Sequence, residues 1–197
     1  MDLVEIFTAI CGLIQSVLIM FKRKENWIFY LLNIISLTVY SYSVSLWGDV
    51  LENSVYIIFG LLGFSTWYSK NISQKLFGED NNIRYCSRKE LARYSIMFIA
   101  IAIGMTVWLT KTNDPSPILD AITTAMGFTA TLMMAFKRIE SWIIWFIDDI
   151  LMAYIYFSLP DPAIYLCALN VIWIALAAGT WYSWHMEYSK RKRAKHG

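Results

Sequence analysis

FKRKENWIFYLLN (residues 21–33) aligns without a gap with FKRIESWIIWFID (136–148), and this repeated string decides the predicted fold. Phe, Lys, Arg, Glu, Trp and Ile recur at an offset of 115 residues, and Gly12 falls on Gly127 at the same offset. Identities at one fixed offset, in a string that contains charges and a tryptophan, indicate an internal repeat rather than the general similarity of apolar segments. The chain is therefore predicted to contain two copies of one unit.

The composition identifies an integral membrane protein. Of the 197 residues 57% are hydrophobic, and the mean hydropathy is +0.46, whereas a soluble domain is usually about half apolar. The apolar residues fall in blocks about twenty residues long, and twenty helical residues span about 30 Å, the thickness of the hydrocarbon core. Because helices satisfy their own backbone hydrogen bonds in lipid, an all-α fold is predicted. The seven predicted transmembrane helices cover residues 3–21, 27–46, 50–69, 91–110, 117–136, 142–159 and 162–184.

Two parallel three-helix repeats joined by a linker helix account for the seven predicted transmembrane helices. Three spans take the chain to the other side of the membrane, so a second copy fused directly to the first would be inverted. One extra span restores the parallel orientation that the two matched basic loops require. The predicted division is a first repeat at 1–70, a cytoplasmic loop and linker helix at 71–115, a second repeat at 116–185 and a basic cytoplasmic tail at 186–197.

The register of the third helix in each repeat is open between two offsets. STWYSK (65–70) resembles GTWYSW (179–184), and an offset of 114 aligns the two TWYS strings. An offset of 117 instead places Asn53 on Asn170 and matches the aromatic residues that follow them. We prefer 117, because it superposes a whole polar and aromatic stripe.

Charge alternates between the loops and orients the chain. By the positive-inside rule, the basic loops lie in the cytoplasm, so the N-terminus is predicted outside and the C-terminus inside the cell membrane. No signal peptide is predicted, since Asp2 and Glu5 stand where a signal would carry basic residues. The basic tail is predicted to contact lipid headgroups rather than nucleic acid. The basic segments are 21–26, 70–90, 136–140 and 190–195, and the acidic segments are 46–53 and 159–162.

Two adjacent acids in an apolar helix are the clearest functional signal. Asp148 and Asp149 lie in the predicted helix 142–159, where one buried charge costs roughly 2.5–3.5 kcal/mol on insertion scales. Trp142, Trp145 and Asp149 are spaced i, i+3, i+7 and share one helix face, with Asp148 about 100° round from it. No predicted span holds a Lys or Arg deep enough to neutralise these acids. Water, a shared proton or a cationic ligand is therefore the expected partner.

Polar and aromatic side chains on other helices extend this candidate substrate site. Asn33 stands at the position of Asp148 in the first repeat. Each candidate also has a structural alternative: a single Asn in a membrane helix often forms an interhelical hydrogen bond, and a Trp beside a basic loop, such as Trp142, can be an interface anchor. The remaining candidates for substrate binding are Gln15, Asn53, Tyr56, Asn170 and Trp173.

These residue types suit a planar, cationic ring carried on a polyol. Aromatic faces attract planar rings and cations, and carboxylates and amides bind hydroxyl groups through directed hydrogen bonds. Enzyme activity is not expected, because intramembrane aspartyl chemistry needs two acids on different helices, and these two are adjacent on one. The three cysteines are scattered and the two histidines lie in or near the tail, so neither a metal nor another cofactor is expected.

ESWIIW (140–145) followed by Asp149, together with ENW (25–27) and GFSTW (63–67), resembles the PnuC family of B-vitamin transporters. That family has the same 3+1+3 arrangement and is similar in architecture to the SWEET sugar transporters. The resemblance covers residues 8–184. It implies a facilitator that moves its substrate down a gradient, trapping of the substrate by a cytoplasmic kinase, and assembly as a homotrimer. The best-known substrate of the family is nicotinamide riboside, and related members carry thiamine or riboflavin.

The resemblance assigns substrate contacts to Trp142, Trp145, Asn33, Asn53 and position 149. This sequence departs from the family pattern, in which position 149 is usually Asn and the residue before it is apolar. An acid favours a cation or a pair of sugar hydroxyls and disfavours an anion. The departure therefore argues against a phosphorylated nucleotide as the substrate.

Several alternatives stay open. Within the same family the substrate is alternatively thiamine or a (deoxy)nucleoside, and two neighbouring acids that share a proton would permit proton coupling. A second class is a substrate-binding membrane subunit that needs an ATPase partner. An ion channel and a membrane enzyme fit the sequence less well. Uptake measurements with and without an added ATPase separate the first two classes.

Overall fold

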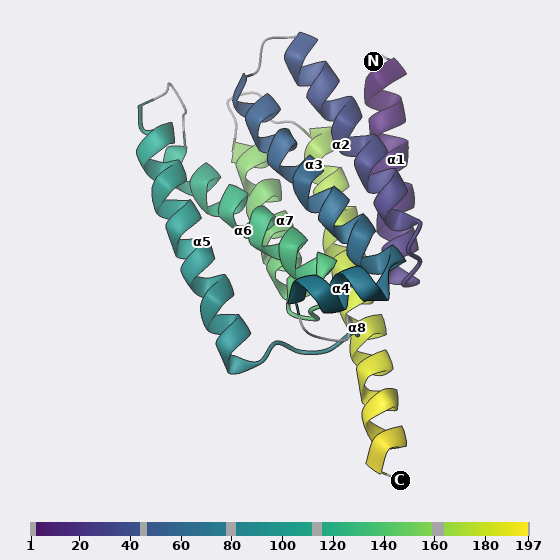
Figure 1. The fold of residues 1–197 in the computed structure, drawn as a ribbon. Coiled ribbons are helices and arrows are strands. Elements are labelled where there is room, and N and C mark those ends of the chain that lie inside the picture. The colour runs from purple at the N-terminus through teal and green to yellow at the C-terminus, as the bar shows by residue number, and fades with distance from the viewer. Residues whose placement is uncertain (1–2, 44–46, 78–81, 112–115, 159–163, 197) are drawn as a thin grey trace. The chain divides into compact units, whose positions relative to one another are not determined.

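The computed structural model describes residues 3–43, 47–77, 82–111, 116–158 and 164–196, and within these ranges the regular structure is helical (Figure 1). In this part of the chain the β-type pairing is an isolated bridge between Arg84 and Arg138. The prediction of an all-α fold is confirmed. The helices are α1 (Leu3–Met20), α2 (Asn26–Ser43), α3 (Trp47–Tyr68), α4 (Lys70–Phe77), α5 (Arg88–Leu109), α6 (Pro117–Ala135), α7 (Ser141–Ser158) and α8 (Ile164–His196).

Seven of these helices match the seven predicted spans. The structure differs from the prediction in one additional short helix and in the length of the last helix. The short helix α4 lies where the sequence predicted a loop. Its eight residues mix polar and apolar types and are too few to resemble a membrane span. Helix α8 continues twelve residues beyond the predicted end at 184, through the predicted tail (Figure 1). Neither Gly nor Pro interrupts residues 185–196, and Lys, Arg, Glu and Ala are strong helix formers. The predicted acidic loop at 159–162 lies outside the described residues.

Length and apolar composition support membrane insertion. Within the described residues, Val50–Tyr68, Arg88–Leu109 and Pro117–Ala135 are long and apolar enough to cross a membrane. Large apolar side chains are also exposed at helical spacing: on α2 they include Ile28, Leu32, Ile35, Val39 and Tyr42. A soluble protein rarely exposes a continuous apolar stripe of this kind, so these faces suit contact with lipid.

The first compact unit consists of residues 1–82 together with 135–137. In this unit α1 packs against α2, and α2 packs against α3. Two glycines of α3 allow the close approach to α2. A Cβ atom at Gly63 would lie 2.3 Å from ring atoms of Trp27, and one at Gly60 would lie 2.7 Å from Leu31. The small residues therefore make room for a bulky indole.

The second compact unit consists of residues 83–134 and 138–197. In this unit α7 packs against α8. Helix α6 is mostly buried and carries many small residues, among them Ala121, Ala125 and Thr131. By contrast, none of the described residues of α5 is buried. Helix α5 begins with a capping box, in which the Ser87 side chain and the Glu90 side chain each bind the other residue's backbone N–H.

The turn before α2 and the turn before α7 have the same backbone. Lys22 and Lys137 are both left-handed, with φ values of 59° and 55°. The residue after each lysine donates its backbone N–H to a carbonyl five residues earlier, Arg23 to Leu18 and Arg138 to Met133, at 2.9 Å in both cases. These are the hydrogen bonds of a Schellman cap, which usually has Gly at the left-handed position. The repeated FKR string thus ends one helix and sets the direction in which the next helix begins.

Candidate functional site

Helix α7 places its two acids on the buried face. Trp142 is 6% exposed, Asp148 6% and Asp149 7%. The opposite face is apolar and open, with Ile147 46% exposed and Tyr154 63%. A helix that turns its acids toward the protein and its isoleucines outward has the pattern expected in lipid. Asp148 and Asp149 are thus both buried in the described part of the chain, and whether they contact substrate stays a prediction.

A pair of tryptophans joins the start of α7 to α8. The rings of Trp142 and Trp184 meet edge to face, with centroids 5.4 Å apart and an angle of 78°. Trp184 is fully buried. The indole Nε1 of Trp142 is also buried, and it donates no hydrogen bond within the described part of the chain. A buried donor without an acceptor is energetically unfavourable, so this N–H is available for a ligand acceptor.

The other predicted residues of the second unit lie on the same two helices. Asn170 of α8 is 3% exposed. Trp145 of α7 and Trp173 of α8 are half-buried. Since α7 and α8 pack against each other, the structure brings these three side chains, Trp142 and the two acids onto one helix pair. This pair is the candidate substrate site of the second unit.

The predicted residues of the first unit are Gln15 on α1, Asn33 on α2, and Asn53 and Tyr56 on α3, and all four are half-buried. The Asn33 side-chain amide donates a 2.7 Å hydrogen bond to the Thr8 carbonyl of α1. The structural alternative that the sequence left open, an interhelical hydrogen bond, thus holds for this amide. Whether these four residues also contact substrate stays a prediction.

The first unit contains a second pair of tryptophans. Trp27 and Trp67 meet edge to face with centroids 6.1 Å apart and an angle of 70°. Trp67 donates its indole N–H to the Ala135 carbonyl at 3.2 Å, and the Lys137 ammonium lies 4.5 Å from its ring centroid. Trp27 stands 115 residues before Trp142, and Trp67 stands 117 residues before Trp184. The sequence placed Trp67 and Trp184 on a stripe but did not predict either pair.

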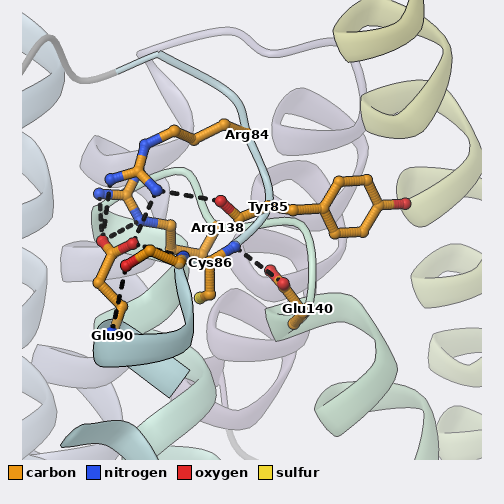
Figure 2. Close-up of polar contacts among 7 residues, drawn as sticks. Arg84, Tyr85, Cys86, Glu90, Arg138 and Glu140 are labelled. Carbon is orange, nitrogen blue, oxygen red and sulfur yellow. Dashed lines mark hydrogen bonds and ion pairs between the residues drawn. The ribbon is translucent and has the colours of Figure 1, made fainter. Parts of the chain in front are cut away.

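A polar network in the second unit was also missed. Arg84 and Arg138 both pair with Glu90, and Glu140 accepts a hydrogen bond from the backbone N–H of Cys86 (Figure 2). The sequence signal for part of this network is the capping box before α5. The pairing of Glu90 with Arg138 gives no local signal, because the two residues are 48 positions apart in the chain. The described residues contain no group of three or more His, Cys, Asp or Glu that could hold a metal ion.

Comparison with known proteins decides the family. Residues 2–186 match the family described as nicotinamide mononucleotide transporter. The chain belongs to the nicotinamide mononucleotide transporter family. The resemblance to PnuC transporters drawn from the sequence is thereby confirmed.

One curated relative is the nicotinamide riboside transporter PnuC of Neisseria mucosa, which is 25% identical over 149 residues. The alignment covers 73% of this chain and 55% of the relative, so the chain spans about half the length of that protein. A solved structure described as the vitamin B3 transporter PnuC matches with a TM-score of 0.71 at 18% identity, over 93% of this chain and 81% of the other. That likeness shows that the chain has the fold of this transporter.

Proposed function

We propose that the chain takes up nicotinamide riboside, or a closely similar vitamin or nucleoside, across the cell membrane by facilitated diffusion. The observation that carries the proposal is the family match over residues 2–186, together with a curated relative named for nicotinamide riboside. The family is named for the mononucleotide, which carries a phosphate. Two buried acids on α7 favour the riboside, because its pyridinium ring is a cation and it lacks that phosphate.

The proposed substrate contacts on α7 are Trp142, Trp145, Asp148 and Asp149. The buried N–H of Trp142 would donate to the substrate, and the acids would accept hydrogen bonds from ribose hydroxyls or face the charged ring. The contacts proposed on other helices are Asn170 and Trp173 on α8 and Gln15, Asn33, Asn53 and Tyr56 in the first unit.

Two parallel repeats around α5 are part of this proposal. Support comes from the two left-handed lysines, the equal Schellman hydrogen bonds and the two edge-to-face tryptophan pairs. The tryptophan pairs favour the offset of 117 for the third helix, because an offset of 114 would match Trp67 with Trp181, whose ring stacks on His185 instead. Repeats of this kind place the substrate near the middle of the membrane.

We also propose that a cytoplasmic kinase traps the substrate by adding negative charge to it. A phosphate adds roughly two negative charges at neutral pH, and the phosphorylated product would then be repelled by the acids of α7. We also propose assembly as a homotrimer, as the family resemblance implies. No ATPase partner is needed in this scheme, because the gradient and the kinase supply the direction of transport.

The experiment that tests the substrate is calorimetric titration of the detergent-purified chain. The ligands are nicotinamide riboside, nicotinamide mononucleotide, thiamine, riboflavin and an uncharged nucleoside, and each is repeated with Asp149→Asn. Glu25→Gln, which changes an exposed acid, is the matched control. We expect nicotinamide riboside to bind, the mononucleotide to bind at least about tenfold more weakly, and Asp149→Asn to reduce that difference. Binding of the uncharged nucleoside alone would contradict the charge argument.

Uptake into liposomes separates the transport mechanisms. Facilitated diffusion predicts uptake of radiolabelled nicotinamide riboside without ATP, and the same final level with and without a proton gradient. A requirement for an added ATPase would overturn the proposal in favour of a substrate-binding subunit. Accumulation driven by a proton gradient would indicate that the adjacent acids carry protons.

A further inference from the structure

The segment from Asn82 to Ser87, here called the strap, holds together three elements of the second unit. It precedes α5 and contacts the turn before α7 and the C-terminal half of α8. Its apolar residue Ile83 is buried at 6% exposure. Its polar groups make contacts on both sides, and none of them belongs to the proposed substrate site.

Glu90 at the start of α5 joins the strap to the turn before α7. Arg84 donates from its two terminal nitrogens to Glu90 at 2.7 and 2.9 Å. Arg138 donates from Nε at 2.9 Å and lies within 2.8 Å through Nη2 (Figure 2). The Arg138 residue is only 5% exposed. A buried guanidinium that lost this carboxylate would be strongly destabilising.

The backbone of the strap is tied to the same turn. The Ile139 N–H donates to the Arg84 carbonyl at 3.1 Å, beside the isolated bridge between Arg84 and Arg138. The Cys86 N–H donates to Glu140 Oε1 at 2.8 Å (Figure 2). Two residues further along, Trp142 begins the substrate face of α7. The strap therefore fixes the point from which that helix starts.

Helix α8 holds the strap from the other side. The Tyr85 hydroxyl and Nδ1 of His185 are 2.8 Å apart in a hydrogen bond. The other imidazole nitrogen lies 3.4 Å from the Ser189 hydroxyl, and Trp181 stacks on the same ring with centroids 5.5 Å apart. Tyr85 also meets the ring of Tyr188 edge to face at 5.3 Å.

The matching turn of the first unit has a different arrangement. There Arg23 donates to Glu25 at 3.0 Å, and the two side chains are 62% and 37% exposed. Arg23 and Glu25 stand 115 residues before Arg138 and Glu140. The same two residue types thus form an exposed local pair in one repeat and hold the strap in the other.

We infer that the strap is a permanent clamp, which keeps the turn before α7 fixed through the whole transport cycle. This inference rests on the proposed transport function. Opening the strap would separate Arg84 from Glu90, the Cys86 N–H from Glu140 and Tyr85 from His185, and would so break contacts to three elements at once. An exposed arginine–glutamate pair contributes little by comparison. Glu90 and Glu140 are accordingly positioning residues for the tryptophan face of α7.

The test uses Cys86 as the reporter of strap opening, in a chain that carries Cys11→Ala and Cys167→Ala. The rate of its alkylation by N-ethylmaleimide is measured in proteoliposomes, with and without nicotinamide riboside at concentrations that sustain uptake. We expect the two rates to agree within about twofold, because a closed strap keeps the thiol shielded throughout. Glu140→Gln removes the carboxylate charge beside the thiol but keeps an acceptor for the Cys86 N–H, so it is the reference for Glu140→Ala. Glu140→Ala should react about tenfold faster than Glu140→Gln, because only the alanine variant loses the hydrogen bond that holds the strap. Glu25→Ala, at the matching position, should leave the rate unchanged.

Uptake is measured on the same variants. Glu140→Ala and Glu90→Gln should raise the KM for nicotinamide riboside, whereas Glu25→Ala should leave the KM unchanged. Tyr85→Phe removes one hydroxyl only, and it serves where a larger change prevents folding, with the same expected direction. Alkylation that accelerates with substrate would overturn the inference, since the strap would then open during transport. Equal alkylation rates in Glu140→Ala and Glu140→Gln would also overturn it. If nicotinamide riboside is not transported, the proposed function fails, while the contrast between those two variants still decides whether the strap holds the turn.

Discussion

At the scale of single residues, Trp142 combines a firmly packed ring with a hydrogen-bond donor that has no acceptor among the described residues. Its ring is packed edge to face on Trp184, and its buried N–H has no acceptor within the described part of the chain. The packing explains why the ring is held in one place. The indole N–H groups of Trp27 and Trp181 are also buried without an acceptor in that part of the chain. Of these three rings, Trp142 shares α7 with Asp148 and Asp149, and this position suits it to the proposed ligand.

Trp142→Phe should weaken binding of nicotinamide riboside about tenfold, because the change removes a hydrogen-bond donor and leaves an aromatic ring against Trp184. Thermal stability in detergent should change little. Trp27→Phe removes the corresponding N–H of the first unit and should leave the affinity unchanged. Calorimetry on both variants checks this, and an equal loss of affinity in the two would contradict the assignment of the site to α7.

Cys86 should react slowly with thiol reagents near neutral pH. Burial, followed by the nearby Glu140 carboxylate, raises the pKa of the Cys86 thiol to about 12, because both disfavour the thiolate. At pH 8 only about one thiol in ten thousand would then be ionised. The alkylation rate should therefore rise about tenfold per pH unit from pH 8 to 10, whereas a free thiol levels off near pH 9. In Glu140→Gln the thiol should ionise at lower pH, and a rate profile unchanged by that substitution would contradict the stated cause.

At the scale of helices, the contact of α2 with α3 depends on one missing side chain. A Cβ atom at Gly63 would lie 2.3–2.4 Å from three ring atoms of Trp27, which is itself fully buried. Gly63→Ala should therefore lower the melting temperature sharply or prevent folding, since overpacking costs typically about 1–3 kcal/mol or more. Gly104→Ala on α5 is the matched control, because a Cβ there meets nothing within 4 Å. It should be neutral or stabilising by up to about 1 kcal/mol through helix propensity. Size-exclusion chromatography of heated samples measures both.

The spans were predictable because each is a long apolar block, and a block of that length has few alternatives in lipid. Helix α4 and the end of α8 were not, since a short segment of mixed polar and apolar residues, or a run of basic ones, forms a helix only where the neighbouring structure permits it. The strap was beyond prediction for another reason. Its ion pairs join Arg84 and Arg138 to the one carboxylate of Glu90, and a sequence does not show which distant charges meet.

The site was predicted in part for the same reasons. Helical spacing placed Trp142, Trp145 and Asp149 on one face, and the burial of Trp142 and the two acids agrees with that spacing. Spacing cannot show what a side chain binds, so the hydrogen bond of Asn33 to Thr8 required the structure. Nor could it show that Trp67 lies against Trp27, because contact between helices depends on their packing angle.

At the scale of the whole molecule, the orientation in the membrane is the next quantity to establish. The positive-inside rule predicts that a green fluorescent protein fused after the C-terminus is fluorescent in the cytoplasm, and that alkaline phosphatase fused there is inactive. Both reporters should behave in the opposite way when fused after residue 50. Replacing the basic residues of 190–195 by Gln should not invert the chain, because the basic loops at 21–26 and 136–140 remain. Active phosphatase at the C-terminus would contradict the predicted topology.

The length of α8 has a practical consequence for imaging. Its 33 residues extend about 50 Å at 1.5 Å per residue, whereas the hydrocarbon core needs only about 30 Å. Once the helix spans the core, about 20 Å of its length lies outside the hydrocarbon. A helical protein fused in register with that helix would turn as one body with the chain. For a chain of only 22.9 kDa, such a handle would add the mass and the asymmetric outline that alignment in electron cryomicroscopy requires.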